Sequence, residues 1–199
     1  MNLVMLAVIP QAPLKQELRG LMEKYCDVLA STRALKMMPH ITLTPPFLTS
    51  SVEELVKHEQ DAVADFKRFS FELGSMDTFN NRVLILHVQS DELKQLHQLV
   101  MEPVAIHREH RWTSNNYTRK LSKRQRELVD KYGDPKVKEF YTPHFTLAKS
   151  DLDKQKLAEI LADKPGLDLP AWEVNSVTVL VHDVKEWKIF KELVLGSKP

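Results

Sequence analysis

The chain of 199 residues contains one cysteine, Cys26, and no long apolar run. A single cysteine cannot form an intramolecular disulfide, which favours a reducing compartment, and its apolar helical surroundings favour burial over reactivity. No stretch approaches the roughly 20 apolar residues of a membrane-spanning helix. The start, MNLVMLAVIP, lacks the basic segment and cleavage site of a signal peptide and reads as a strand. We therefore expect a soluble, cytoplasmic monomer without a membrane partner.

The chain also carries little net charge, +1 from 28 basic and 27 acidic residues. This balance excludes a protein that coats a polyanion with its whole surface, but it does not exclude local charged patches. A chain of this length can bury a core without disulfides or metals. We expect residues 1–199 to form a single bilobal domain.

One short pattern occurs twice, as Pro39-His40-Ile41-Thr42-Leu43 and Pro143-His144-Phe145-Thr146-Leu147. In a strand, successive side chains point to opposite faces. The histidine and threonine of each copy therefore share one face, and the apolar residue between them takes the other. One such string is common in structural strands, but its repetition favours a function.

The two strings occupy matching places in a repeated order of strand, helix, motif strand, helix and strand. The expected elements are residues 3–9, 12–30, 40–44, 51–67 and 69–77 in the first copy, and 83–88, 91–102, 143–148, 151–162 and 174–181 in the second. Residues 187–195 are expected to form a last strand. This pattern predicts an α+β fold, a bilobal pseudo-twofold duplication with largely antiparallel sheets lining a central cleft, where the motif strands face one another.

Two histidines facing one cleft suit a reaction in which one oxygen loses a proton and another gains one, because histidine titrates near neutral pH. Threonine hydroxyls can donate hydrogen bonds to phosphate oxygens whose charge grows in the transition state. Two histidines alone fall short of a zinc site, so we expect neither metal nor cofactor. His107 and His110 are spaced to share a helix face but lack a third ligand, and we interpret them as surface residues.

With both strings in register with the duplication, the chain resembles the 2H phosphoesterase superfamily, and within it the 2'-5' RNA ligase-like and 2',3'-cyclic phosphodiesterase group. The resemblance implies metal-independent cleavage of cyclic phosphodiesters with His40, Thr42, His144 and Thr146 as the catalytic set. Many members have arginine three residues after the second threonine, where this chain has Lys149, a point charge in place of a bidentate fork.

Residues 107–142 form a basic insertion that the first half lacks. Its aromatic and cationic residues, Trp112, Tyr117 and Arg119 among them, could stack bases and bind RNA phosphates. A solvated helix over 119–132 is the alternative. Lys36, just before the first motif, is a further candidate for binding phosphate, against the default of an exposed loop cation.

The main functional hypothesis is a phosphodiesterase that opens 2',3'-cyclic phosphates of RNA ends or nucleotides. The reverse reaction, 2'-5' ligation of RNA, is a second activity that the sequence leaves undecided. One alternative keeps the fold and changes the substrate to a non-RNA sugar cyclic phosphate. Another is a nucleotide- or RNA-binding module without turnover.

Overall fold

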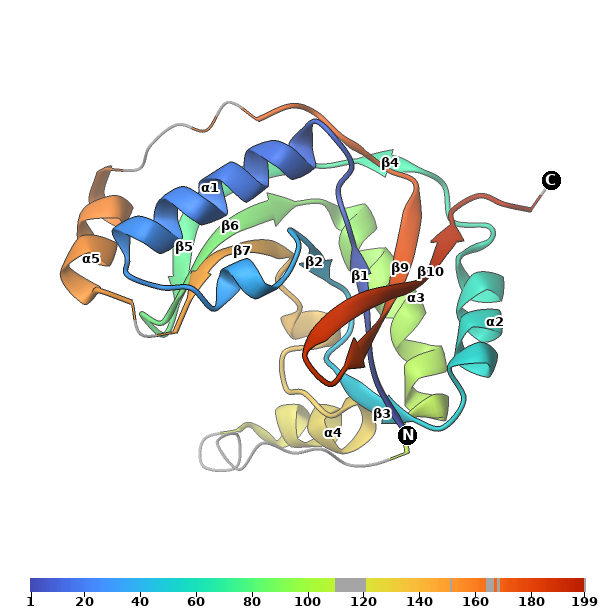
Figure 1. The fold of residues 1–199 in the computed structure, drawn as a ribbon. Coiled ribbons are helices and arrows are strands. Elements are labelled where there is room, and N and C mark those ends of the chain that lie inside the picture. The colour runs from blue at the N-terminus through green and yellow to red at the C-terminus, as the bar shows by residue number, and fades with distance from the viewer. Residues whose placement is uncertain (110–120, 151, 164–166, 168, 199) are drawn as a thin grey trace.

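The computed structural model describes residues 1–109, 121–150, 152–163, 167 and 169–198. Helices and short strands are mixed along the chain, in agreement with the predicted α+β class (Figure 1). The strands are β1 (Asn2–Val8), β2 (Ile41–Thr42), β3 (Phe47–Thr49), β4 (Phe69–Ser70), β5 (Glu72–Phe79), β6 (Val83–Gln89), β7 (His144–Lys149), β8 (Glu173–Val174), β9 (Ser176–Asp183) and β10 (Glu186–Val194). The helices are α1 (Leu14–Val28), α2 (Val52–Val63), α3 (Asp91–His107), α4 (Lys123–Tyr132) and α5 (Lys154–Asp163), with 3-10 turns η1 (Ala34–Lys36) and η2 (Lys138–Phe140).

Within the described residues, one eight-stranded antiparallel sheet follows the order β10-β9-β1-β2-β7-β6-β5, and β3 also pairs with β1. Without the edge strand β10, this path is symmetric about the contact between β2 and β7, with β9-β1-β2 on one side and β7-β6-β5 on the other. The two halves exchange a strand: β5 of the first half pairs with β6 of the second, and β9 of the second half pairs with β1 of the first. Figure 1 shows β1, β9 and β10 on one side of β2 and β5, β6 and β7 on the other. The predicted duplicated α+β fold is therefore confirmed.

The central strands are buried on both sides. Val4, Leu6 and Val8 of β1 belong to the main core, whereas Met5 and Ala7 pack with Leu180 in a smaller cluster on the opposite face. This explains the uninterrupted apolar run at the start of the chain. In β2 and β7, Ile41 and Phe145 are at most 1% exposed and belong to the main core, so their neighbours in sequence face the other way.

Two local features differ from the sequence prediction. Helix α3 does not end at the expected residue 102 but continues through Pro103 to His107, because the fully buried Val104 extends the apolar stripe. The helix begins at Asp91 as expected and is capped by Ser90, whose hydroxyl accepts a hydrogen bond from the Leu93 N–H at 3.0 Å. The prolines after β2 are followed at once by the unpredicted strand β3. Residue 151, the expected start of a later helix, lies outside the described residues.

Buried His97 of α3 connects the first motif strand to η2. Its Nδ1 donates to the Leu43 carbonyl at 2.6 Å, and its Nε2 accepts from the Lys138 N–H at 2.7 Å. The imidazole stacks on Tyr141, with ring centres 3.9 Å apart, and the Tyr141 hydroxyl donates to the Thr42 carbonyl at 2.9 Å. These contacts fix the end of β2 from two directions.

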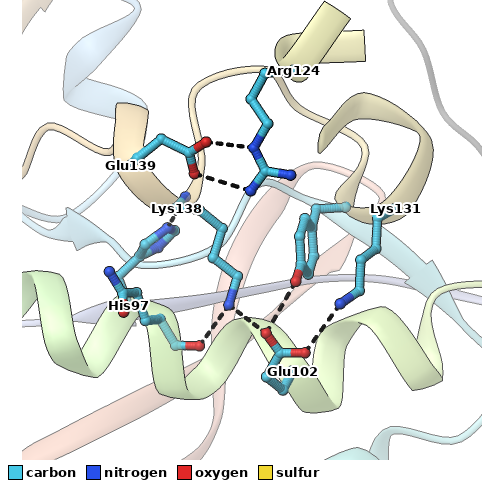
Figure 2. Close-up of polar contacts among 8 residues, drawn as sticks. His97, Glu102, Arg124, Lys131, Lys138 and Glu139 are labelled. Atoms are coloured by element: carbon cyan, nitrogen blue, oxygen red, sulfur yellow. Dashed lines mark hydrogen bonds and ion pairs between the residues drawn. The ribbon is translucent and has the colours of Figure 1, made fainter. Parts of the chain in front are cut away.

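Charged side chains secure the same region, as Figure 2 shows. The Lys138 ammonium donates to Glu102 at 2.5 Å and to the Gln98 carbonyl at 2.9 Å, both on α3. Hydrogen bonds from Lys138 first, and from Tyr132 and Lys131, lower the pKa of Glu102 to about 2. Arg124 of α4 in turn donates to Glu139 of η2. Helices α3 and α4 and the turn η2 are thus joined by one polar network.

The His97 contacts require a neutral imidazole, and burial lowers its pKa to about 4. Since an unfolded histidine titrates near 6.5, the unfolded chain binds more protons between these values, and stability falls as pH decreases. We expect His97 to reduce the free energy of unfolding by roughly 3 kcal/mol from pH 7 to pH 4. Urea unfolding of wild type and His97→Gln across this range tests this; equal pH dependence in both would contradict it.

Helix α2 carries a buried acid that the sequence pattern did not single out. Glu59 lies on the same face as Val52, Leu55 and Val63 and is 0% exposed. Neither carboxyl oxygen has a hydrogen-bond partner among the described residues, and burial raises the pKa well above 4.5. The folded protein therefore binds this proton more tightly than the unfolded chain, and stability falls as pH rises above 4.5.

Replacing this acid with an apolar side chain of similar length is expected to stabilise the protein. Glu59→Met removes a buried carboxyl group to which no described residue hydrogen-bonds, and it should raise the free energy of unfolding at pH 7 by on the order of 1–3 kcal/mol. Denaturant unfolding measures this, with Glu53→Met at an exposed position of α2 as the matched control. A destabilised Glu59→Met protein, beside an unchanged control, would show that the carboxyl group has a favourable contact.

Candidate functional site

The two motif strands pair with one another in the centre of the sheet. Ile41 of β2 is the partner of Phe145 of β7 in an antiparallel register. One step to either side, His40 lies opposite Thr146, and Thr42 lies opposite His144. Directly opposed residues have Cβ atoms about 4.5–5.5 Å apart. The register therefore brings all four motif residues together on the face away from Ile41 and Phe145.

Both histidines are held by the same local contact. Nδ1 of His40 lies 2.8 Å from the Met38 carbonyl oxygen, and Nδ1 of His144 lies 2.7 Å from that of Thr142. A carbonyl oxygen only accepts, so Nδ1 carries the proton in each ring. Nε2 is then the proton acceptor of each neutral imidazole. The duplication thus extends from the strand order to the tautomer of the two histidines.

Burial lowers the pKa of both histidines below 6.5. For His40, the positive charge of Lys149 and the proximity of His144 act in the same direction, while the bond to Met38 opposes them. For His144, His87 and Lys136 add to the effect of burial, and the bond to Thr142 opposes it. At neutral pH the protein without ligand therefore holds both imidazoles mainly in the neutral form.

A cavity lies on each side of this cluster. The His144-side cavity, about 420 Å³, is lined by Thr42, Leu43, Thr44, Pro45, Phe79, His97, Gln125, Asp134, Lys136, Val137, Phe140, Tyr141, Thr142 and His144. The His40-side cavity, about 270 Å³, is lined by Met5, Met22, Ala34, Met37, Met38, His40, Thr42, Pro46, Thr146, Lys149 and Trp187. Thr42 lines both cavities. The four motif residues thus stand where two separate spaces meet.

The substrate-binding candidates from the sequence fall into three groups. Lys149 lines the His40-side cavity, and burial together with the charge of Arg33 lowers its pKa. Lys36 is exposed at the end of η1 and is not among the described residues that line either cavity. Trp112, Tyr117 and Arg119 lie outside the described residues. The solvated helix expected over 119–132 corresponds in part to α4, whose described bounds are Lys123–Tyr132.

Several cavity residues carried no signal in the sequence. Trp187 packs beside Met5 and Leu180 and also lines the His40-side cavity. Phe79 and Lys136 reach the His144-side cavity from β5 and from the segment after α4. Neither residue belongs to a sequence motif; the pairing of β5 brings Phe79 to this cavity, and the turn after α4 brings Lys136 there.

The described residues contain no group of three or more histidine, cysteine, aspartate or glutamate side chains arranged to hold a metal ion. His107, part of the pair considered from sequence, has its Nε2 2.8 Å from Nδ1 of His58; His110 is outside the described residues. None of the described helices has both the length and the hydropathy of a bilayer-spanning segment.

Several solved structures share this fold. The protein TT0787 of Thermus thermophilus matches with a TM-score of 0.56 over 100% of both chains at 14% identity. LigT of E. coli in its apo form has a TM-score of 0.56 at 13% identity, covering 98% of this chain and 97% of LigT. LigT with 3'-AMP has a TM-score of 0.54 at 14% identity, covering 98% of each chain. At such identities the likeness shows the fold alone. A comparison with curated protein sequences found no match.

The family comparison covers most of the chain. The model of the 2'-5' RNA ligase superfamily matches residues 9–186, a span that contains both motif strings and the strands that carry them. The chain therefore belongs to the 2'-5' RNA ligase superfamily, among the 2H phosphoesterases that its paired motifs resemble.

Proposed function

We propose that the protein is a metal-independent phosphoesterase that opens 2',3'-cyclic phosphodiesters of RNA ends or nucleotides. The observation that carries this proposal is the register of β2 and β7, which sets each motif histidine opposite the threonine of the other copy. A phosphorus centre placed over the paired strands β2 and β7 would have one imidazole for the oxygen that loses a proton and one for the oxygen that gains a proton. Family membership supports phosphoesterase chemistry.

In the proposed reaction, Nε2 of one histidine takes a proton from water as the water oxygen bonds to phosphorus. The bond from phosphorus to one ribose oxygen breaks, and the other histidine donates its proton to that oxygen. The product is a ribonucleotide monoester. The two histidines have then exchanged their protonation states, and proton exchange with solvent restores them. Either histidine can take either role in this scheme.

The other motif residues would act on the non-bridging oxygens. Thr42 and Thr146 are uncharged donors, suited to oxygens whose charge grows in the five-coordinate transition state. Lys149 would add a positive charge from the His40 side. LigT has been solved with phosphate, 3'-AMP and ATP, ligands that carry phosphate groups as the proposed substrate does.

Each motif histidine should be essential for turnover. We expect His40→Ala and His144→Ala each to lower kcat/KM for a nucleoside 2',3'-cyclic phosphate by about 10²- to 10⁴-fold, measured in excess chelator. His58→Ala, at an exposed position on α2, serves as the matched control and should stay close to wild type. Turnover by wild type that requires a metal, or nucleotide binding without any turnover, would contradict the proposal; the latter result would favour a binding module.

The pKa directions also predict a pH profile. In the free enzyme kcat/KM requires one neutral and one protonated histidine, and both have pKa values lowered below 6.5. We therefore expect a bell-shaped kcat/KM profile with its maximum on the acidic side of pH 6.5. The bound phosphodiester anion favours protonated histidine, so the kcat profile should lie at higher pH. Steady-state kinetics between pH 4 and 9 test this, and a kcat/KM that still rises above pH 7 would contradict it.

A further inference from the structure

A second lysine lies beside the motif cluster, opposite the one found from sequence. Lys136 lines the His144-side cavity, where its ammonium is 4.8 Å from the centre of the Phe79 ring. The Phe79 ring meets His144 edge-on, with ring centres 4.9 Å apart at 88°. A cation, an aromatic ring and a motif imidazole therefore follow one another along one wall of this cavity.

The position of Lys136 is fixed by contacts that leave its charge available. Its backbone N–H donates to Asp134 Oδ1 at 2.7 Å, which sets the turn after α4. The face of Phe79 then holds the ammonium by a cation–π contact. Among the described residues, no carboxylate forms an ion pair with this ammonium. Asp134 lines the same cavity, where it accepts a hydrogen bond from the backbone N–H of Lys136. Burial raises the pKa of Asp134 above 3.8 and outweighs the nearby Lys136 charge, which lowers that pKa.

The two lysines serve different sides of the cluster. Lys149 lies in the His40-side cavity and Lys136 in the His144-side cavity, and the two linings have only Thr42 in common. The electrostatics agree with this separation, because Lys149 lowers the pKa of His40 and Lys136 lowers that of His144. A cyclic phosphodiester has one negative charge, which Lys149 would match. The charge of Lys136 is left without a counterpart in such a substrate.

We propose that Lys136 binds a second phosphate group of the substrate, so that the protein prefers nucleotides with a further phosphate near the cyclic phosphate over nucleoside cyclic monophosphates. This inference rests on the proposed function for the identity of the reacting group. The cavity volume of about 420 Å³ falls within the usual range for small-molecule sites. Apolar Val137, Phe140 and Tyr141 line the space that a nucleoside would occupy next to that phosphate.

The second phosphate can be a 5'-phosphate on the same nucleoside or the next diester of an RNA strand. The kinetic test therefore compares three substrates with the same terminal base: the nucleoside 2',3'-cyclic phosphate, its 5'-phosphorylated form, and a dinucleotide ending in the cyclic phosphate. We expect one or both phosphate-bearing substrates to have a kcat/KM at least about 10-fold higher, through KM, in line with a charge-assisted contact. The substrate that gains identifies the source of the phosphate.

The variants assign this preference to Lys136. Lys136→Met keeps an apolar stem over Phe79 and should bring the three kcat/KM values within about 2-fold, whereas Lys136→Arg should keep most of the preference. Lys57→Met, at an exposed position of α2, is the matched control. A wild type without preference, or a Lys136→Met protein that retains it, would overturn the inference.

A binding measurement keeps this test separate from that of the proposed function. Calorimetry compares a nucleoside 3'-monophosphate with the corresponding 3',5'-bisphosphate on wild type and Lys136→Met. Tighter binding of the bisphosphate, by about 10-fold and only with Lys136 present, supports the second phosphate site even if cyclic phosphates are not turned over. Equal affinity of the two ligands for wild type, together with equal turnover of the mononucleotide and dinucleotide substrates, overturns it.

Discussion

The pairing of β2 with β7 is the interaction on which the arrangement of the site depends. A shift of one residue in this register would turn the histidines and threonines into the core and expose Ile41 and Phe145. Because those two residues are almost fully buried, the hydrophobic core itself enforces the register. The energy that folds the sheet thus also sets the face on which the reactive side chains lie, and the bonds of His40 to Met38 and of His144 to Thr142 then orient the two rings.

Strand β2 is short, and the structure supports it from outside the sheet. His97 binds the Leu43 carbonyl and Tyr141 binds that of Thr42, so residues of α3 and of the segment after η2 hold the motif strand. Glu102 of α3 forms ion pairs with Lys138 of η2 and Lys131 of α4, which attach both of these elements to α3 (Figure 2). One wall of the His144-side cavity is consequently built on this network, which links the stability of the region to the shape of the site.

The sequence was sufficient for the features that depend on short-range patterns. The shared face of the histidine and threonine in each Pro-His-x-Thr-Leu string and the duplicated order of elements follow from periodicities of two and 3.6 residues. Contacts between distant segments were not predictable in the same way. Phe79 and Lys136 reach His144 only because β5 crosses to the second half and α4 is followed by a turn. Glu59 on an apolar face and α3 beyond Pro103 show packing prevailing over local preference.

The proposed chemistry requires that both histidines contact the same phosphorus centre. A crystal structure with a nucleoside 2',3'-cyclic vanadate, a mimic of the five-coordinate state, tests this most directly. We expect Nε2 of His40 and Nε2 of His144 each to lie about 2.6–3.2 Å from a different oxygen on vanadium, with the threonine hydroxyls on the remaining oxygens. A vanadate bound to only one histidine, or bound away from β2 and β7, would contradict the account.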